Sequence, residues 1–169
     1  MCLELILPSA EYRDSWEAAQ FEFDVEGAFK LQEIGNEWIR ESPAVLYASE
    51  EQCHFSSKWI PTKTYWLVRE KRFLGQVDIR PQLTKELAAF GGQVGYVIRP
   101  SARLQGFGKK LLSLALDKAG ELGLEKVLVT CDENNMASKK IIVTSGGRLY
   151  DKLYDAVREV TILRYWIIL

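Results

Sequence analysis

The sequence predicts a protein of the α/β or mixed α+β class, with one central sheet and helices on both faces. Short β-rich runs alternate along the chain with stretches of helical apolar spacing. One unit, residues 93–130, reads strand, helix, strand, which predicts a right-handed crossover between parallel strands. No repeat, low-complexity tract or linker divides the 169 residues, so we expect a single domain over residues 1–169.

The N-terminal part predicts one strand and two helices. Residues 3–7 are β-rich and are stopped by Pro8, after which Ser9 can cap a helix. The apolar residues at helical spacing in that helix are Tyr12, Trp16, Ala19 and Phe23. Residues 29–40 repeat the helical pattern, and residues 41–62 have no regular pattern.

The middle of the chain predicts three strands. Residues 64–68 and 73–79 are β-rich and are separated by the charged residues 69–72, which indicates a hairpin. Residues 81–92 form an insertion or a short helix that ends in two glycines. Residues 93–98 form a further strand, which Arg99 and Pro100 close because proline cannot donate the next ladder bond.

The C-terminal part alternates helices and strands. A long amphipathic helix over residues 109–122 ends at Gly123, and its apolar face comprises Leu111, Leu112, Ala115, Leu116, Ala119 and Leu122. Residues 127–130 read as a buried strand and residues 137–144 as a helix followed by a glycine turn. Residues 148–150 and 157–168 then predict the last two strands.

Composition excludes several classes of function. The 22 basic and 23 acidic residues give a net charge of −1, so bulk charge does not favour a nucleic-acid partner. No apolar run is long enough to cross a membrane, and no secretory signal opens the chain. His54 lies beside Cys53 without a second ligand pair, so we expect no metal site. Three widely spaced cysteines favour the reducing cytoplasm.

The loop between residues 98 and 110 predicts an anion-binding site. It carries Arg103, Gly106 and Gly108 and leads directly into the long amphipathic helix. Glycines let the backbone approach a ligand, and the first amides of a helix attract negative charge. Because Lys109 and Lys110 add positive charge there, we expect the loop to hold a diphosphate.

Spacing argues against the two common nucleotide motifs. A dinucleotide fingerprint needs a third glycine where Leu111 stands. A Walker A loop needs glycine at the position of Arg103 and a hydroxyl residue at that of Lys110. An enzyme that binds a nucleotide phosphate through this loop therefore remains only a weak alternative.

The loop instead follows the pattern [QR]xxGx[GA], here Arg103-Leu104-Gln105-Gly106-Phe107-Gly108, after a VGYVIRP strand. A second segment, Asn135-Met136-Ala137-Ser138, opens a helix that ends at two glycines. Together these segments resemble the GNAT acetyltransferase superfamily, clearly over residues 65–150. Within it, the GGQVGY strand, the TCDENN segment and the C-terminal YWI strand resemble a group of bacterial N-acetyltransferases of undefined substrate. The resemblance implies the GNAT fold, a mixed and twisted sheet of six to seven strands.

The resemblance also implies an activity. The enzyme would move an acetyl group from acetyl-coenzyme A (acetyl-CoA) to an amine of a small molecule or peptide, by direct attack in a ternary complex. Implied cofactor-binding residues are Val97, Ile98, Arg103, Leu104, Gln105, Gly106, Phe107, Gly108, Lys109, Asn135 and Ser138. The backbones of Val97 and Ile98 would pair with the pantetheine arm, and the loop amides would hold the pyrophosphate. Asn135 suits a plain helix cap equally well.

One position departs from the family pattern. Many members have a tyrosine four residues after Ser138 that protonates the departing thiolate, and this chain has Ile142 there. The departure leaves open a non-catalytic acyl-CoA-binding module or sensor as an alternative. Phenol acids could come from Tyr96, Tyr150 or Tyr154, for which core packing is the ordinary alternative.

The motifs assign no general base, and three side chains are candidates. Asp78 alternates with apolar neighbours in a strand, so it could also face solvent. Glu86 could be a solvated helix charge, and His54 a surface residue that titrates near neutrality. A homodimer is a further expectation, because the apolar strand over residues 161–169 could pair at a sheet edge or lie inside its own sheet.

Overall fold

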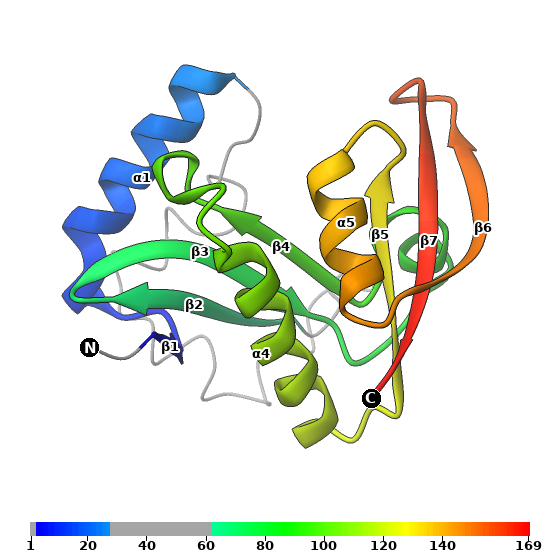
Figure 1. Cartoon of the computed structure of the whole chain (residues 1–169), viewed down its shortest axis with the longest axis horizontal. Helices are drawn as coiled ribbons and strands as arrows, with labels where there is room; N and C mark the ends of the chain where they lie inside the picture. The colour runs from blue at the N-terminus through cyan, green and yellow to red at the C-terminus, as the bar shows by residue number, and fades with distance from the viewer. Residues whose placement is uncertain (1–2, 28–61) are drawn as a thin grey trace, which may run out of the picture.

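The computed structural model describes residues 3–27 and 62–169 of the chain. Its centre is a seven-stranded mixed sheet in the order β1-β2-β3-β4-β5-β7-β6 (Figure 1). The strands are β1 (Glu4–Ile6), β2 (Lys63–Arg69), β3 (Arg72–Ile79), β4 (Val94–Ile98), β5 (Lys126–Asp132), β6 (Arg148–Asp155) and β7 (Val160–Ile168). The longer helices are α1 (Arg13–Glu26), α4 (Phe107–Glu121) and α5 (Met136–Thr144). The predicted α/β fold is therefore confirmed.

Neighbouring strands are antiparallel except β4 and β5, which are parallel and joined by α4. Short helical turns fill three connections: η1 (Ala10–Tyr12), η4 (Leu87–Gly91) and η5 (Pro100–Ala102). Ser9 caps η1 as predicted, since its hydroxyl accepts the amide hydrogen of Glu11 at 3.3 Å.

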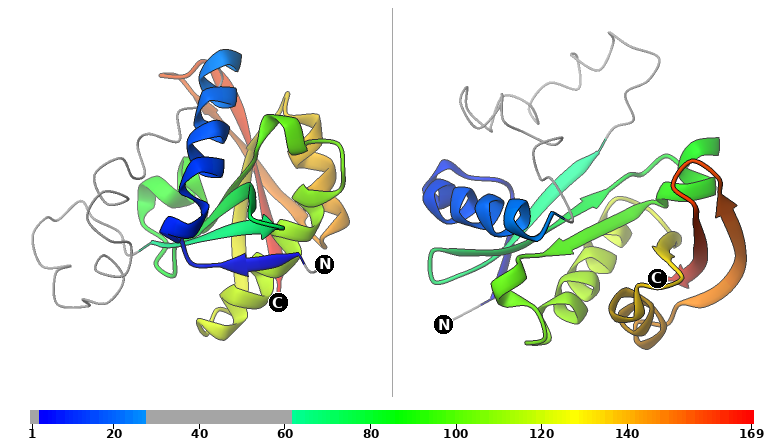
Figure 2. Two further views of the ribbon diagram at one scale, coloured as in Figure 1. Left: turned by 90° about the vertical axis from the view of Figure 1, so that its left-hand side faces the viewer. Right: turned by 90° about the horizontal axis from the view of Figure 1, so that it is seen from above.

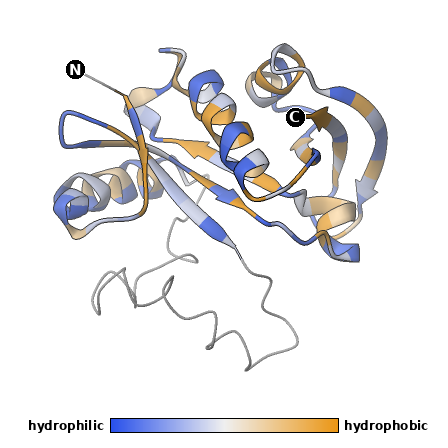
Figure 3. Cartoon of the chain, turned by 90° about the horizontal axis from the view of Figure 1, so that it is seen from below, coloured by the Kyte–Doolittle hydropathy of each residue, from blue (hydrophilic) through white to orange (hydrophobic). Residues whose placement is uncertain are grey.

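The helices cover opposite faces of the sheet, with α1 on one side and α4 and α5 on the other (Figure 2). Side chains alternate along β2, so that Trp66 packs under α1 while Leu67 packs under α4. The core under α1 comprises Trp16, Ala19, Phe23, Trp66, Val68 and Phe73. The larger core under α4 is continuous across the sheet, and Figure 3 shows mainly hydrophobic strands beside that helix.

The C-terminal hairpin differs from the sequence prediction. Residue 157 was expected to begin the last strand, but β6 continues to Asp155 and β7 starts only at Val160. The Asp155 carboxylate accepts the amide hydrogens of Val157 (3.0 Å) and Arg158 (3.1 Å), which fixes a turn there. Because β7 lies between β5 and β6, the alternative in which this strand lies inside its own sheet is confirmed, and pairing at a free edge is not its role.

His54, the expected helix over residues 29–40 and most of the irregular segment before residue 62 lie outside the described residues.

Candidate active site

A gap opens in the sheet between β4 and β5. The two strands share one register pair, Val94 with Val129, and the amide of Gln93 donates to the carbonyl of Leu128 at 2.7 Å. Beyond this point β4 and β5 diverge toward their carboxyl ends (Figure 1). Among the residues that the structure describes, no strand therefore pairs with the edge of β4 that follows Val94 on that side.

Alternation along β4 decides which backbone groups face the gap. The amide of Arg99 donates to the carbonyl of Leu74 on β3 at 2.9 Å. In an antiparallel pair the residues two apart share this direction, so the backbone groups of Val97 also point to β3. Those of Tyr96 and Ile98 point into the gap. The expected pairing through Val97 is corrected accordingly, and the Val97 side chain packs against the core under α1.

The glycine loop ends where α4 begins. Gly106 is the N-cap residue with φ +82°, a left-handed conformation that favours glycine. The first bond of the helix runs from the amide of Lys110 to the carbonyl of Gly106 at 3.2 Å. The amides of Phe107, Gly108 and Lys109 precede it and therefore have no acceptor within the helix. These amides and the helix dipole make the start of α4 favourable for an anion.

Gly108 lets α4 approach α5 closely. A Cβ atom built on Gly108 would lie 2.7 Å from the Cδ1 of Ile141 on α5 and 3.7 Å from the Cγ1 of Ile98 on β4. A side chain at this position would require the end of the Ile141 side chain to move, whereas its contact with Ile98 would be an ordinary one. The glycine thus leaves room for α5 to pack against the start of α4.

Arg103 does not contribute its charge in the expected way. Its guanidinium lies 2.8 and 3.0 Å from the two carboxylate oxygens of Glu26 and 5.8 Å from the ring centre of Phe23. Its Nε donates to the carbonyl of Ile98 at 3.2 Å. Glu26 therefore largely neutralises Arg103, and the exposed Lys109 and Lys110 remain as cations at the start of α4.

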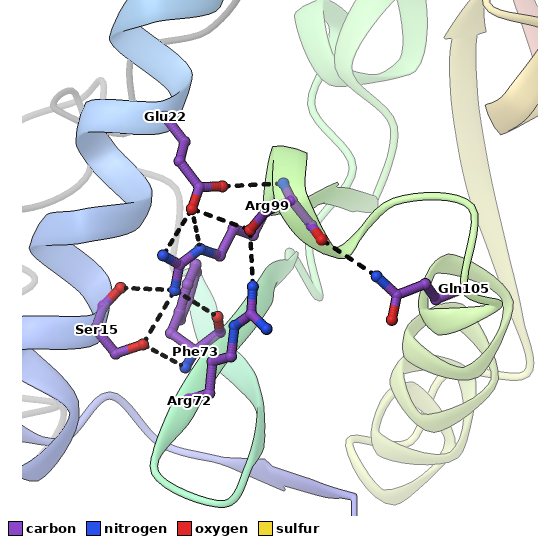
Figure 4. Close-up of polar contacts among 7 residues, drawn as sticks. Ser15, Glu22, Arg72, Phe73, Arg99 and Gln105 are labelled. Carbon is purple, nitrogen blue, oxygen red and sulfur yellow. Dashed lines mark hydrogen bonds and ion pairs between the residues drawn. The ribbon is translucent and has the colours of Figure 1, made fainter.

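A buried arginine fixes the strand that leads into this loop (Figure 4). Arg99 is 8% exposed, and its Nη2 and Nε lie 2.7 and 2.8 Å from Glu22 on α1. Glu22 also accepts the amide hydrogen of Ser101 at 2.9 Å, and Gln105 donates to the Ser101 carbonyl at 3.2 Å. No local pattern in the sequence marks Glu22, because its partner Arg99 follows 77 residues later.

These contacts strongly favour the ionised form of the Glu22 carboxyl group. Burial opposes its ionisation, but hydrogen bonds from Arg99 and Ser101 outweigh that effect and lower the pKa of Glu22 to about 2. The same arginine donates to the carbonyl and the hydroxyl of Ser15 at 3.2 and 3.1 Å. Helix α1 and the loop before α4 are thus held together by charged hydrogen bonds.

The start of α5 lies on the other side of the gap. Asn135 caps α5, since its side-chain oxygen accepts the amide hydrogen of Ser138 at 3.0 Å. The hydroxyls of Tyr96 and Ser138 lie 2.9 Å apart, which joins β4 to α5. Burial raises the pKa of Tyr96 to about 12, against the effect of the Ser138 hydrogen bond. The phenol therefore keeps its proton at neutral pH.

Two neighbouring positions have structural roles. Ile142, which stands where many family members have tyrosine, is fully buried in the core under α4. Cys131 on β5 is also buried, and burial raises the pKa of its thiol to about 11. Such a thiol is not a nucleophile at neutral pH.

Asp78 on β3 does not face solvent, so that expectation is wrong. Its carboxylate accepts hydrogen bonds from the Thr64 hydroxyl (2.6 Å) and the Gln76 amide (3.4 Å). Arg80 lies 3.9 Å away. Burial raises the pKa of Asp78, and these three neighbours only partly oppose the effect.

The remaining candidates lie in less suitable places. Glu86 is exposed, as its solvated-charge interpretation predicts. Tyr150 and Tyr154 are 63% and 64% exposed, so core packing is the wrong interpretation for both. They lie on β6, which β7 and β5 separate from the gap.

Two kinds of feature are absent from the described residues. No helix among residues 3–27 and 62–169 is both long and apolar enough to span a membrane. Within the same ranges, no group of three or more histidine, cysteine, aspartate and glutamate side chains could hold a metal ion.

Comparisons with known proteins agree with this geometry. The model of the acetyltransferase (GNAT) domain matches residues 13–148. A Salmonella typhimurium acetyl transferase that modifies the N-terminal serine of ribosomal protein L7/L12 is 16% identical, with a TM-score of 0.68 over 99% of this chain and 95% of that chain.

Two further solved structures have the same fold. The microcin C7 self-immunity acetyltransferase MccE, in complex with acetyl-CoA and AMP, is 13% identical with a TM-score of 0.67 over 99% of this chain and 92% of that chain. The Vibrio cholerae spermidine/spermine N-acetyltransferase SpeG is 15% identical with a TM-score of 0.61 over 99% and 95%. A search of curated proteins found no significant match.

Proposed function

The chain belongs to the GNAT acetyltransferase family, and from this premise we propose that it transfers an acetyl group from acetyl-CoA to an amine. The observation that carries the proposal is the start of α4, where amides without helical acceptors adjoin the open edge of β4. We infer a cytoplasmic location, to which the free buried thiol of Cys131 is suited.

The loop before α4 would hold the pyrophosphate of acetyl-CoA. Three amides at the start of a helix, with the exposed Lys109 and Lys110 beside them, provide donors and positive charge for it. Because Arg103 is paired with Glu26, we assign the side chain of Arg103 to positioning the loop. The pyrophosphate would therefore be held mainly by backbone amides.

The gap between β4 and β5 would take the pantetheine arm. An extended amide chain can pair with an open strand edge as a further strand would. Tyr96 and Ile98 present their backbone groups to that edge, and we assign the pairing to them. Asn135 uses its side-chain oxygen for the helix cap, so its amide group stays available as a donor to the arm.

The transfer itself is a direct displacement. The neutral amine attacks the thioester carbon, the carbon–sulfur bond breaks, and the products are an N-acetyl amide and the free thiol. One proton leaves the amine, and the sulfur gains one. A gap-facing amide, such as that of Ile98, would stabilise the oxyanion that forms on the carbonyl oxygen.

Ser138 and Tyr96 would supply the proton to sulfur. Their hydroxyls form one hydrogen-bonded pair at the mouth of the gap, where the thioester would lie. The high pKa of Tyr96 keeps the pair protonated at neutral pH. This pair would take the role of the tyrosine that Ile142 replaces.

An amine acceptor is consistent with the descriptions of two structural relatives. One is described as modifying an N-terminal serine and another as a spermidine/spermine N-acetyltransferase. We therefore propose a small-molecule or peptide amine as the acceptor.

Calorimetry with acetyl-CoA tests the cofactor site. Gly106→Glu places a negative charge at the start of α4 and strains a backbone with φ +82°. We expect affinity for acetyl-CoA to fall by about 30-fold or more, since a charge at this end is worth up to about 2 kcal/mol and the strain adds to it. Gly120→Glu adds the same charge at the exposed far end of α4, where a Cβ atom meets no neighbour, and should leave affinity unchanged.

Two outcomes would contradict the proposal. One is the absence of heat or thermal stabilisation with acetyl-CoA at millimolar concentration. The other is equal binding by the Gly106→Glu and Gly120→Glu variants. If acetyl-CoA binds but no amine in a broad panel releases free thiol, the chain is instead an acyl-CoA-binding module.

A further inference from the structure

A buried charge pair lies on the face of the sheet opposite α4. Asp78 on β3 and Arg80, just after it, alternate with Ile79 and therefore project to the same side, the side of α1. Asp78 is 7% exposed and the Arg80 side chain 23%, so both groups are largely removed from water. The proposed transfer mechanism uses neither of them.

This pair adjoins the strand that would hold the thioester. Asp78 is the register partner of Gly95 on β4, next to Tyr96. A Cβ atom built on Gly95 would lie 3.3 Å from one terminal nitrogen of Arg80. The guanidinium therefore covers the bare backbone of β4 at Gly95, one residue from the gap. Neighbouring strands lie about 4.8 Å apart, so both side chains lie within one strand spacing of the β4 backbone that borders the gap.

Asp78 and Arg80 form only a loose ion pair. Their nearest nitrogen and oxygen are 3.9 Å apart, beyond the 2.7–2.9 Å of a charged hydrogen bond. Thr64 and Gln76 donate to the carboxylate, but neither carries a charge. Among the described residues, Arg80 has no ion pair other than this loose one. Arg80 is partly exposed, so its guanidinium donors are not used up by Asp78 and can be reached by a ligand.

We propose that Asp78 and Arg80 bind the ammonium and the carboxylate of an α-amino acid, which is the acetyl acceptor. This inference rests on the proposed function and specifies its substrate class. A ligand with opposite charges on adjacent positions can lie antiparallel to the Asp78–Arg80 pair, so that each charge meets its opposite.

The charge count favours this acceptor over a simple amine. A bound alkylammonium would place a second cation beside one carboxylate already shared with Arg80. In a partly buried site that repulsion is only weakly screened. An amino acid brings its own carboxylate for Arg80 and leaves the site with two cations and two anions.

Asp78 can then also accept the proton that the ammonium must lose. The proton moves to the carboxylate, the freed nitrogen pair attacks the acetyl carbon, and the carbon–sulfur electrons leave with the thiolate. That thiolate takes its proton from the pair of hydroxyls at Ser138. Exchange with water then removes the proton from Asp78 and returns one to the hydroxyl pair, so no further reactant is needed.

Thiol release with matched acceptors tests the proposal. The twenty standard L-amino acids are assayed first, each at several concentrations with saturating acetyl-CoA. Every amino acid that reacts is then compared with its carboxamide and with the amine that lacks the carboxylate. We expect kcat/KM to fall at least 30-fold for both analogues of the best amino acid.

Variants distinguish the role of Arg80 from that of Asp78. Arg80→Gln should lower kcat/KM for that amino acid by at least 30-fold and for its carboxamide by less than threefold, because only the former offers Arg80 a carboxylate. Arg80→Lys should keep part of the preference for the amino acid over its carboxamide that Arg80→Gln loses. Asp78→Asn should lower turnover of all three acceptors, and Arg13→Gln, at an exposed pair on α1, should change none of them.

Each other result decides against the inference. It is overturned if simple amines or carboxamides react as well as amino acids, or if Arg80→Gln affects all acceptors equally. It is also overturned if no amino acid either reacts or raises the melting temperature of the complex with coenzyme A. The proposed function survives these results provided that acetyl-CoA binds and some other amine releases thiol.

Discussion

Arg99 at the end of β4 and Glu22 on α1 form a buried charged pair, with nitrogen and oxygen 2.7 Å apart. The same carboxylate holds the amide of Ser101, in the turn that leads to the glycine loop. The pair thus fixes the end of β4 relative to α1. The position of the loop before α4 therefore depends on a helix from the start of the chain.

Breaking this pair should destabilise the fold. Arg99→Met leaves the Glu22 carboxylate partly buried without its main partner, and we expect a loss of about 3 kcal/mol in the free energy of unfolding. Urea denaturation monitored by circular dichroism measures it. Arg13→Met removes an exposed pair and should cost less than about 1 kcal/mol. Equal losses in the two variants would show that the Arg99 pair has no special role.

Acid should weaken the same contact. The pKa of Glu22 is lowered to about 2 from an ordinary value of 4.5. A lowered pKa in the folded state contributes stability that is complete above about pH 4.5 and is lost as pH falls toward 2. The stability difference between wild type and Glu22→Gln should shrink over this interval. A difference that is constant with pH would contradict the assignment.

The hydroxyl pair at the gap should affect the rate of transfer and not cofactor affinity. We expect Ser138→Ala to lower kcat by about 100-fold and Tyr96→Phe by about 10-fold, while the Kd for acetyl-CoA changes less than threefold. Because the pKa of Tyr96 is raised to about 12, kcat should show no alkaline decline below about pH 10 that is due to this group. A loss of cofactor affinity that parallels the loss of kcat would instead indicate a packing role.

Asp78→Asn should stabilise the folded protein while lowering its turnover. The raised pKa means that the fold favours the protonated carboxyl, so stability is lost as pH rises through that pKa. At pH 7 asparagine removes this penalty, and we expect the melting temperature to rise by about 2–4 °C. The gain should vanish as pH falls toward 4. A lower melting temperature at neutral pH would indicate that the carboxylate serves the fold.

Arg103→Gln should change cofactor affinity little. The guanidinium is engaged by Glu26 and by the Ile98 carbonyl, so its charge is not directed at the start of α4. We expect less than a threefold change in the Kd for acetyl-CoA. Lys109→Gln, which removes an exposed cation at that end, should weaken binding more. The reverse order would return Arg103 to the pyrophosphate site.

Local patterns in the sequence were sufficient for the elements and for the glycine loop. Apolar spacing placed α4 and α5, and Ser9 and Asn135 marked helix starts that the structure confirms. The β-α-β pattern also predicted the parallel pair of β4 and β5. These features depend on residues close together in the chain, where spacing alone carries the information.

The end of β6 was missed because a single side chain decides it. Asp155 turns the chain with two hydrogen bonds to backbone amides, whereas the apolar pattern by itself ended the strand at residue 150. Only the paired strands reveal where β7 begins.

The amino-acid sequence by itself predicted the order of the strands and longer helices that the structure describes, the family resemblance and the glycine loop before α4, because each is encoded by neighbours in the chain. The tertiary structure alone decided that Asp78 is buried, that Arg103 is neutralised, and that Tyr96 meets Ser138. Burial and charge pairing depend on which distant segments pack together. The order of residues along the chain does not give the distances between such segments. Those distances set the pKa values of the site and decide which of its hydrogen-bond donors are available to a ligand.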